Sequence, residues 1–213
     1  MQRGSFSDVS IVSCGTLSLE LNYLRKMGFL DATQLLYTTA GLHQDCRELE
    51  RQLVQRIAKA RQTADKVIVV YGGKFCYVNV KEPTRTLEKI VAEQGPHVVR
   101  IEASHCVDML ADASERESIA DGEQIWWMTP GWIEFRHRVF AGWDKGLANE
   151  NFPRHTGGAM VLDAIGYFDQ YVEERPEELL EYSDWMGIPI QAHPISLDRL
   201  KSLLLEAATR LRE

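Results

Sequence analysis

The chain lacks long hydrophobic runs and has few cysteines. No apolar run in its 213 residues comes near the roughly 18 residues that a membrane-spanning helix needs, so we expect no membrane partner. The 4 cysteines are too few for a disulfide scaffold. In a reducing compartment, cysteines are instead core fillers, metal ligands or reactive thiols.

Basic residues are outnumbered by acidic ones, and the N-terminal sequence does not resemble a secretory signal. The chain has 24 Lys and Arg against 31 Asp and Glu, and this net charge of −7 argues against a nucleic-acid partner, which calls for a basic face. The N-terminal residues lack the apolar core and small-residue cleavage site of a secretory signal, so we expect a cytoplasmic protein. A hydrophobic content of 45% is ordinary for a globular protein, and a chain of this length can bury one large core.

Strand-like and helix-like segments alternate over residues 8–130. The predicted strands are residues 9–13, 34–38, 66–71, 97–101 and 124–128, with a further edge strand at 188–191. The predicted helices are residues 16–27, 45–61, 84–92, 132–147, 157–172, 176–185 and 197–211. This order predicts an α/β fold with a mostly parallel, doubly wound, Rossmann-like sheet. We expect a single domain over residues 1–213, with the mainly helical residues 131–213 packed on the sheet.

Four residues with soft or imidazole side chains recur at the ends of predicted strands. Cys14, His43, Cys76 and Cys106 follow one another at intervals of about 30 residues, the length of one strand-plus-helix unit. If the strands are parallel neighbours, the four side chains emerge at one edge of the sheet, where open α/β folds bind ligands. For Cys14, the start of the following helix would lower the pKa of the thiol. The alternative for each cysteine is burial as a small apolar residue.

Zinc is the metal that three sulfurs and an imidazole predict. Thiolates and imidazole suit zinc, and its tetrahedral geometry needs four ligands. No CxxC pair is present, so the predicted site is assembled from distant strand ends, as in catalytic zinc sites with one open position. His105 is an alternate ligand or a partner that orients one. Cys46, one turn into a predicted helix, adds a sulfur or packs in the core.

A second cluster is aromatic and surrounds the Thr-Pro-Gly turn at residues 129–131. Trp126, Trp127 and Trp132, together with Tyr71 at the end of the third strand, are candidates for the wall of a substrate site. Such a wall could bind a quaternary or methylated amine through cation–π contacts. Packing of large aromatic residues in the core is the alternative, and composition alone favours it.

These motifs together resemble a known family. They resemble domain of unknown function sixteen-thirty-eight over approximately residues 8 to 190, in Cys14-Gly15, Leu19-Glu20-Leu21, Leu42-His43, Tyr71-Gly72, His105-Cys106 and the Met-Thr-Pro-Gly-Trp string at 128–132. The resemblance matches Cys76 only loosely. Members of that family are often encoded beside corrinoid-dependent methyltransferases for methylated amines. The resemblance therefore implies a role in methyl transfer or in its support, in which a corrinoid could take part through a partner protein.

Two hypotheses from different classes follow. In the first, a zinc–thiolate protein supports one-carbon or methyl-group transfer with a methylated amine or a corrinoid methyltransferase system. In the second, a non-catalytic accessory protein binds a corrinoid, a methylated amine or a partner methyltransferase through the aromatic pocket. A thiol redox protein that uses Cys76 and Cys106 is a third reading, although no CxxC pair supports it. The sequence does not decide whether the protein is an enzyme, and no residue is assigned a catalytic role.

Overall fold

Two parallel sheets form the framework of the protein. The computed structural model describes residues 6–213, so residues 1–5 of the segment inspected for a secretory signal lie outside the described residues. The first sheet has the order β2-β1-β3-β4 and the second has the order β5-β6-β7, with every neighbouring pair parallel. The strands are β1 (Val9–Cys14), β2 (Gln34–Thr38), β3 (Lys66–Val70), β4 (Val98–Arg100), β5 (Trp126–Met128), β6 (Ala159–Asp163) and β7 (Ile190–Pro194).

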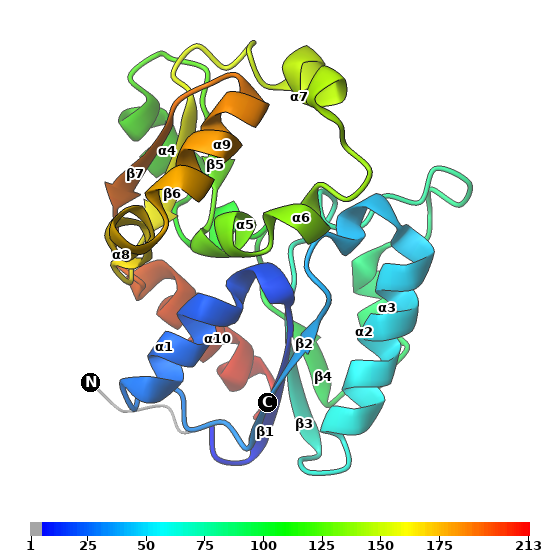
Figure 1. The fold of residues 1–213 in the computed structure, drawn as a ribbon. Coiled ribbons are helices and arrows are strands. Elements are labelled where there is room, and N and C mark those ends of the chain that lie inside the picture. The colour runs from blue at the N-terminus through cyan, green and yellow to red at the C-terminus, as the bar shows by residue number, and fades with distance from the viewer. Residues whose placement is uncertain (1–5) are drawn as a thin grey trace.

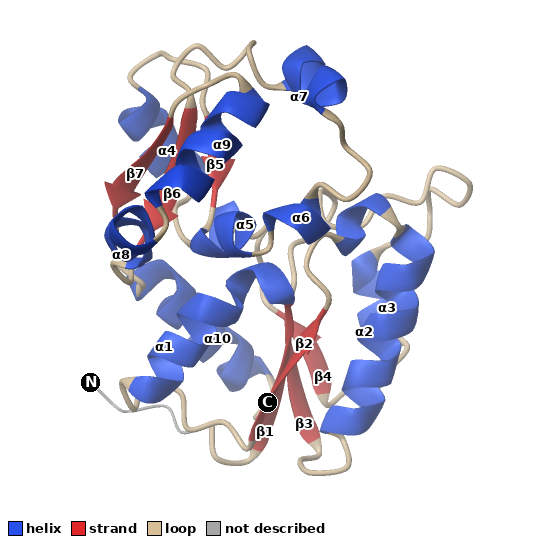
Figure 2. Cartoon of the chain, in the orientation of Figure 1, coloured by secondary structure: helices blue, strands red, loops and turns tan. Residues whose placement is uncertain are grey.

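Helices cover both faces of the first sheet (Figures 1 and 2). On one face lie α1 (Ser18–Lys26) and α10 (Asp198–Arg210), and on the other lie α2 (Cys46–Ala60) and α3 (Leu87–Ala92). Because the strands are apolar on both sides, each face closes a separate buried core. The strand order reverses between β1 and β3, which makes the carboxyl ends of these two strands the switch point where doubly wound folds bind ligands.

The second sheet lies beyond the carboxyl edge of the first (Figure 1). The chain reaches it through η3 (Val107–Met109) and α4 (Ala113–Ala120). The helices that accompany its strands are α5 (Pro130–Glu134), α6 (Arg136–Val139), α7 (Lys145–Asn151), α8 (Tyr167–Glu174) and α9 (Pro176–Met186). These elements bury a third core that is rich in aromatic rings. The chain then returns to the first sheet as α10, so the two sheets do not correspond to two consecutive halves of the chain.

The predicted parallel α/β class is confirmed, with two local corrections. The helix predicted over 157–172 is wrong in its first half, because residues 159–163 form β6 and the helix begins only at Tyr167. The apolar run Ala159–Leu162 is buried on both sides of a central strand, and such a run has no periodicity that separates strand from helix. The helix predicted over 132–147 is divided into α5, α6 and α7. Gly142, with φ +82°, lies between α6 and α7. The strand predicted beside Pro189 is β7, which lies at an edge of its sheet.

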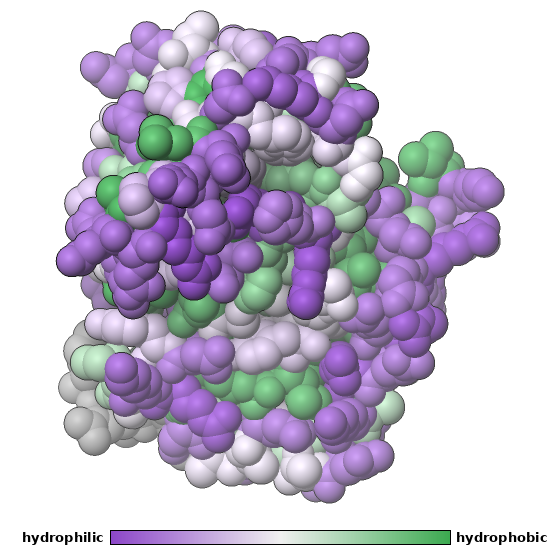
Figure 3. Space-filling view, viewed as in Figure 1, coloured by the Kyte–Doolittle hydropathy of each residue, from purple (hydrophilic) through white to green (hydrophobic). Residues whose placement is uncertain are grey.

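Polar and charged side chains cover most of the surface in the view of Figure 3. Within residues 6–213, no helix combines the length and apolar character needed to cross a bilayer. An exception to the polar surface is the segment between β3 and α3, which projects from the body in Figure 1 and exposes Phe75, Val78 and Val80. Val80 is 84% exposed.

Candidate functional site

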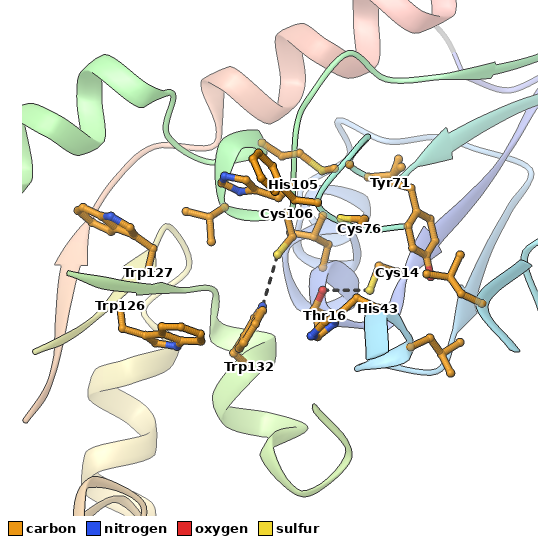
Figure 4. A pocket seen from close by; sticks show the side chains of 18 of the residues that line it. Cys14, Thr16, His43, Tyr71, Cys76, His105, Cys106, Trp126, Trp127 and Trp132 are labelled. Carbon is orange, nitrogen blue, oxygen red and sulfur yellow. Dashed lines mark hydrogen bonds between the residues drawn. The ribbon is translucent and has the colours of Figure 1, made fainter. Parts of the chain in front are cut away.

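A cavity of about 440 Å³ lies between the carboxyl edge of the first sheet and strand β5. Its wall brings together side chains from the ends of β1 and β3, the segment before η3, and β5 and α5 (Figure 4). Every residue that the sequence proposed for a metal or substrate site lies on this wall: Cys14, His43, Tyr71, Cys76, His105, Cys106, Trp126, Trp127 and Trp132. Cys46 does not line the cavity and packs instead against the core beneath α2. The placement follows from parallel strands, whereas the assigned roles stay predictions.

Cys14 is the last residue of β1, and its sulfur faces the turn that follows. Thr16 donates a hydrogen bond from its hydroxyl to the Cys14 sulfur at 3.1 Å. Burial nevertheless raises the pKa of the Cys14 thiol above its ordinary value. The chain enters the short 3-10 helix η1 (Gly15–Leu17) here, and the Thr16 hydroxyl and backbone hydrogen bonds do lower the pKa of Cys14, but desolvation outweighs them.

Gly72 allows Cys76 and Cys106 to approach each other. A Cβ atom on Gly72 would lie 2.4 Å from the Cα of His105 and 2.7 Å from the Cys76 sulfur, closer than real contacts allow. The turn that carries Cys76 therefore packs directly on the segment that carries Cys106. The Gly73 amide donates to the carbonyl of Ala103 at 2.9 Å and ties the same two segments together.

The three cavity thiols interact unfavourably when they ionise. Burial raises the pKa of Cys76, and the neighbouring Cys106 and Cys14 thiols raise it further. Burial also raises the pKa of Cys106 to about 12, with Cys14 again adding to the shift. Across the cavity lining that the structure describes, no Asp, Glu, Lys or Arg is present to offset a thiolate charge. The three thiols are therefore neutral at pH 7 unless a cation joins them.

The two histidines differ in what they offer a ligand. His105 accepts a hydrogen bond at Nδ1 from the Asp108 amide at 3.1 Å, which leaves Nε2 of the neutral ring carrying the proton. Burial, with Arg116 nearby, lowers the pKa of His105. His43 stacks on the indole of Trp132, with ring centroids 5.7 Å apart and planes 24° apart, and desolvation lowers its pKa as well. His43 is thus the better source of a free nitrogen lone pair.

The aromatic residues both line the cavity and belong to the core. Trp132 donates from Nε1 to the Cys106 sulfur at 3.4 Å. Trp126 lies against the rings of Trp132, Phe152 and His155, with centroids between 4.9 and 6.0 Å apart. Both tryptophans also pack against the third core, so the same side chains line the cavity and stabilise the second sheet. Tyr71 is 2% exposed and its hydroxyl pairs with Thr38, so it supplies wall surface rather than a free hydroxyl.

A tight junction joins the second sheet to the Cys14 turn. Thr129 donates from its hydroxyl to the carbonyl of Thr16 at 3.0 Å. A Cβ on Gly131 would lie 2.1 Å from that same carbonyl oxygen, so only glycine fits. The second sheet therefore docks on the residues that present Cys14, and the cavity forms between them.

Glu20 is a buried acidic residue to which no role was assigned from the sequence, and it does not line the cavity. Its side chain is fully buried, and within the described structure neither carboxyl oxygen has a hydrogen-bond partner. Burial raises the pKa of Glu20 to about 8, and the nearby Asp163 adds to the rise. Glu20 also helps to raise the pKa of Cys106, which places it near the thiols. The signal was available, because Glu20 falls between Leu17 and Leu24 on the apolar face of α1.

The thiols and imidazoles are not assembled as a ready metal site. Across residues 6–213, no three His, Cys, Asp or Glu side chains are arranged so that they could hold a metal ion. A metal ion would therefore need side-chain rotation to bring the sulfurs onto it.

One family model matches the chain. It is described as "Protein of unknown function (DUF1638)" and covers residues 37–204, a span that includes His43, Cys76, Cys106 and all three cavity tryptophans. No curated protein and no solved structure matches the chain.

Proposed function

This chain belongs to the DUF1638 family of proteins of unknown function, and we propose that it binds zinc through its cavity thiols and supports methyl-group transfer. The observation that carries the proposal is the convergence of Cys14, Cys76 and Cys106 in one cavity, where Cys14 and Cys106 raise the pKa of Cys76 and Cys14 raises the pKa of Cys106. Three neutral thiols in an apolar cavity are poor nucleophiles. A bound dication removes this obstacle, because it offsets the repulsion between thiolates.

The donor set suits zinc in kind and number. Cys14, Cys76 and Cys106 would supply thiolate sulfur, and His43 would supply a ring nitrogen that has no backbone hydrogen bond within residues 6–213. His105 serves better as an orienting neighbour, since its Nδ1 is already an acceptor. The four cysteines are free thiols, as metal binding requires, and we place the protein in the reducing cytoplasm on that ground.

The chemistry proposed is transfer of a methyl group to sulfur. Zinc holds a coordinated thiol deprotonated near neutral pH, so that its sulfur can accept a methyl group. The uncharged wall, with Trp126 and Trp127 on the side opposite the thiols, keeps water away from that sulfur. In this proposal the methyl donor is a methylated amine or a methylcorrinoid that a partner methyltransferase or corrinoid protein holds. The S–C bond would form as the N–C or Co–C bond breaks, and the amine or the Co(I) corrinoid would leave with the bonding electron pair.

Zinc binding by single cysteine variants tests the proposal. Reduced wild-type protein is expected to bind about one zinc, and Cys14→Ser, Cys76→Ser and Cys106→Ser are each expected to weaken binding by about a hundredfold or more, because each removes a thiolate ligand. Competition against a chromophoric chelator measures the affinity. Cys46→Ser is the matched control, since Cys46 is equally half-buried but lies outside the cavity. Wild-type protein that binds no zinc, or a Cys46→Ser loss equal to the others, contradicts the proposal.

An accessory binding protein is the second candidate function, and the uncharged wall with three tryptophans favours it. This candidate needs the aromatic wall but not the thiols. A protein with all three cavity cysteines changed to serine distinguishes the two. If the folded triple variant keeps the wild-type quenching of tryptophan fluorescence by trimethylamine or by a corrinoid, the accessory function is favoured. If the quenching requires the cysteines, the zinc–thiolate function is favoured.

A further inference from the structure

The Thr-Pro-Gly-Trp turn is the most distinctive motif of the sequence, and the function proposed above does not explain it. The turn follows β5, opens α5 and packs on the segment after Cys14 through two contacts with the Thr16 backbone. Thr129 donates to the Thr16 carbonyl at 3.0 Å, and Gly131 leaves no room for a Cβ against the same oxygen. Pro130 occupies the first helical position, where its missing N–H costs nothing. These contacts fix where α5 begins and therefore where Trp132 lies.

Trp132 touches two of the candidate ligands at once. Its indole Nε1–H donates to the Cys106 sulfur at 3.4 Å, and its ring stacks on the imidazole of His43 (Figure 4). Cys106 follows β4 and His43 follows β2, which are the two edge strands of the first sheet. Trp132 lies on α5, which follows the first strand of the second sheet. One side chain from outside the first sheet therefore contacts residues that follow its two opposite edges.

We infer that Trp132 is a positioning residue, which holds the Cys106 sulfur and the His43 ring in one arrangement and is itself held by the Thr129–Gly131 contacts. The indole hydrogen bond orients the sulfur, and the stacked ring limits rotation of the imidazole. An N–H donor to sulfur strengthens when the thiol becomes a thiolate. The metal part of this inference rests on the proposed function, whereas the hydrogen bond to Cys106 does not.

Zinc affinity of tryptophan variants tests the positioning role. Trp132→Phe keeps an aromatic ring for the stack on His43 but removes the N–H donor, and loss of such an orienting partner typically weakens metal binding by about tenfold to a hundredfold. Trp127→Phe is the control, because Trp127 lines the same cavity and none of its described contacts is a hydrogen bond to a cysteine. We expect at least about a tenfold loss for Trp132→Phe and a change within about twofold for Trp127→Phe. The sulfur-to-metal charge-transfer bands of the Co²⁺-loaded protein should shift only in Trp132→Phe. Equal affinities and unshifted bands for the two variants overturn the inference.

A second measurement needs no metal. The 5 tryptophans give 5 indole N–H signals in a nitrogen-15 NMR spectrum, and the Trp132 signal is assigned by its loss in Trp132→Phe. In zinc-free protein, Cys106→Ala should shift the Trp132 signal and speed its hydrogen exchange, while the Trp127 signal stays in place. An unchanged Trp132 signal overturns the inference even if zinc binds. Wild-type protein that fails to bind zinc, with the Trp132 signal responding as expected, refutes the proposed function and leaves the hydrogen bond established.

Discussion

Gly131→Ala is expected to lower the melting temperature by roughly 10 °C, through a loss of about 3 kcal/mol in the free energy of unfolding. The added methyl group would lie 2.1 Å from the Thr16 carbonyl oxygen and 2.8 Å from the Thr16 Cα. Both neighbours are backbone atoms, so no flexible side chain can move aside. The junction between the two sheets must open instead, which also displaces the Cys14 turn. Thermal unfolding followed by circular dichroism measures the loss.

Gly146→Ala is the matched control for this prediction. Gly146 also lies in a short helix, α7, and its Cβ would meet only the side chain of Asp144, at 3.2 Å. Alanine has the higher helix propensity, so this variant is expected to be neutral or slightly stabilised. If both variants melt together with the wild type, the close approach of Gly131 to Thr16 is wrong.

Glu20→Gln is expected to stabilise the protein at pH 8 by a few kcal/mol and to change little below pH 4.5. Burial raises the folded-state pKa of Glu20 from 4.5 to about 8. Between these two pH values the folded protein retains a proton that the unfolded chain releases, so wild-type stability falls as pH rises through this window. Above about pH 8 the full cost of a buried carboxylate is present. Glutamine never ionises, so the variant does not lose unfolding free energy as the pH rises through this window.

Urea unfolding at a series of pH values measures the effect. The difference in unfolding free energy between Glu20→Gln and wild type should grow steadily from about pH 4.5 to pH 8. Glu206→Gln is the control, because Glu206 is exposed to solvent on α10 whereas Glu20 is buried. A constant difference across the pH range would show that Glu20 is solvated or paired in solution.

The sequence predicted the first sheet well because its strands carry the strongest signals. Lys66–Val70 is a β-branched run of strand length, and the helix that precedes it buries Leu49, Leu53 and Ile57 at helical spacing. Parallel pairing then requires that the residues after β1 and β3 meet at one edge. The gathering of Cys14, Cys76 and Cys106 in one cavity follows from this topology together with the close packing of the two later loops at Gly72.

The second sheet and the pKa shifts of the cysteines could not be predicted from the sequence, for physical reasons. Strand β6 is an apolar run that suits a buried helix or a buried strand equally, so its pairing with β5 could not be foreseen. The raised pKa values of the cysteines depend on how much water reaches each sulfur and on the distances among the three. Both are tertiary quantities. The contact of Trp132 with Cys106 likewise depends on how the second sheet docks.

The coordination of bound zinc tests most directly whether the three cavity thiols act as one metal-binding set. X-ray absorption at the zinc edge counts the sulfur atoms around the metal in reduced, zinc-loaded protein. We expect three sulfur neighbours at about 2.3 Å, with nitrogen or oxygen at about 2.0 to 2.1 Å completing the shell. We further expect one sulfur to disappear in any variant of Cys14, Cys76 or Cys106 that still retains zinc. A shell of nitrogen and oxygen alone would contradict zinc binding by the cavity thiols.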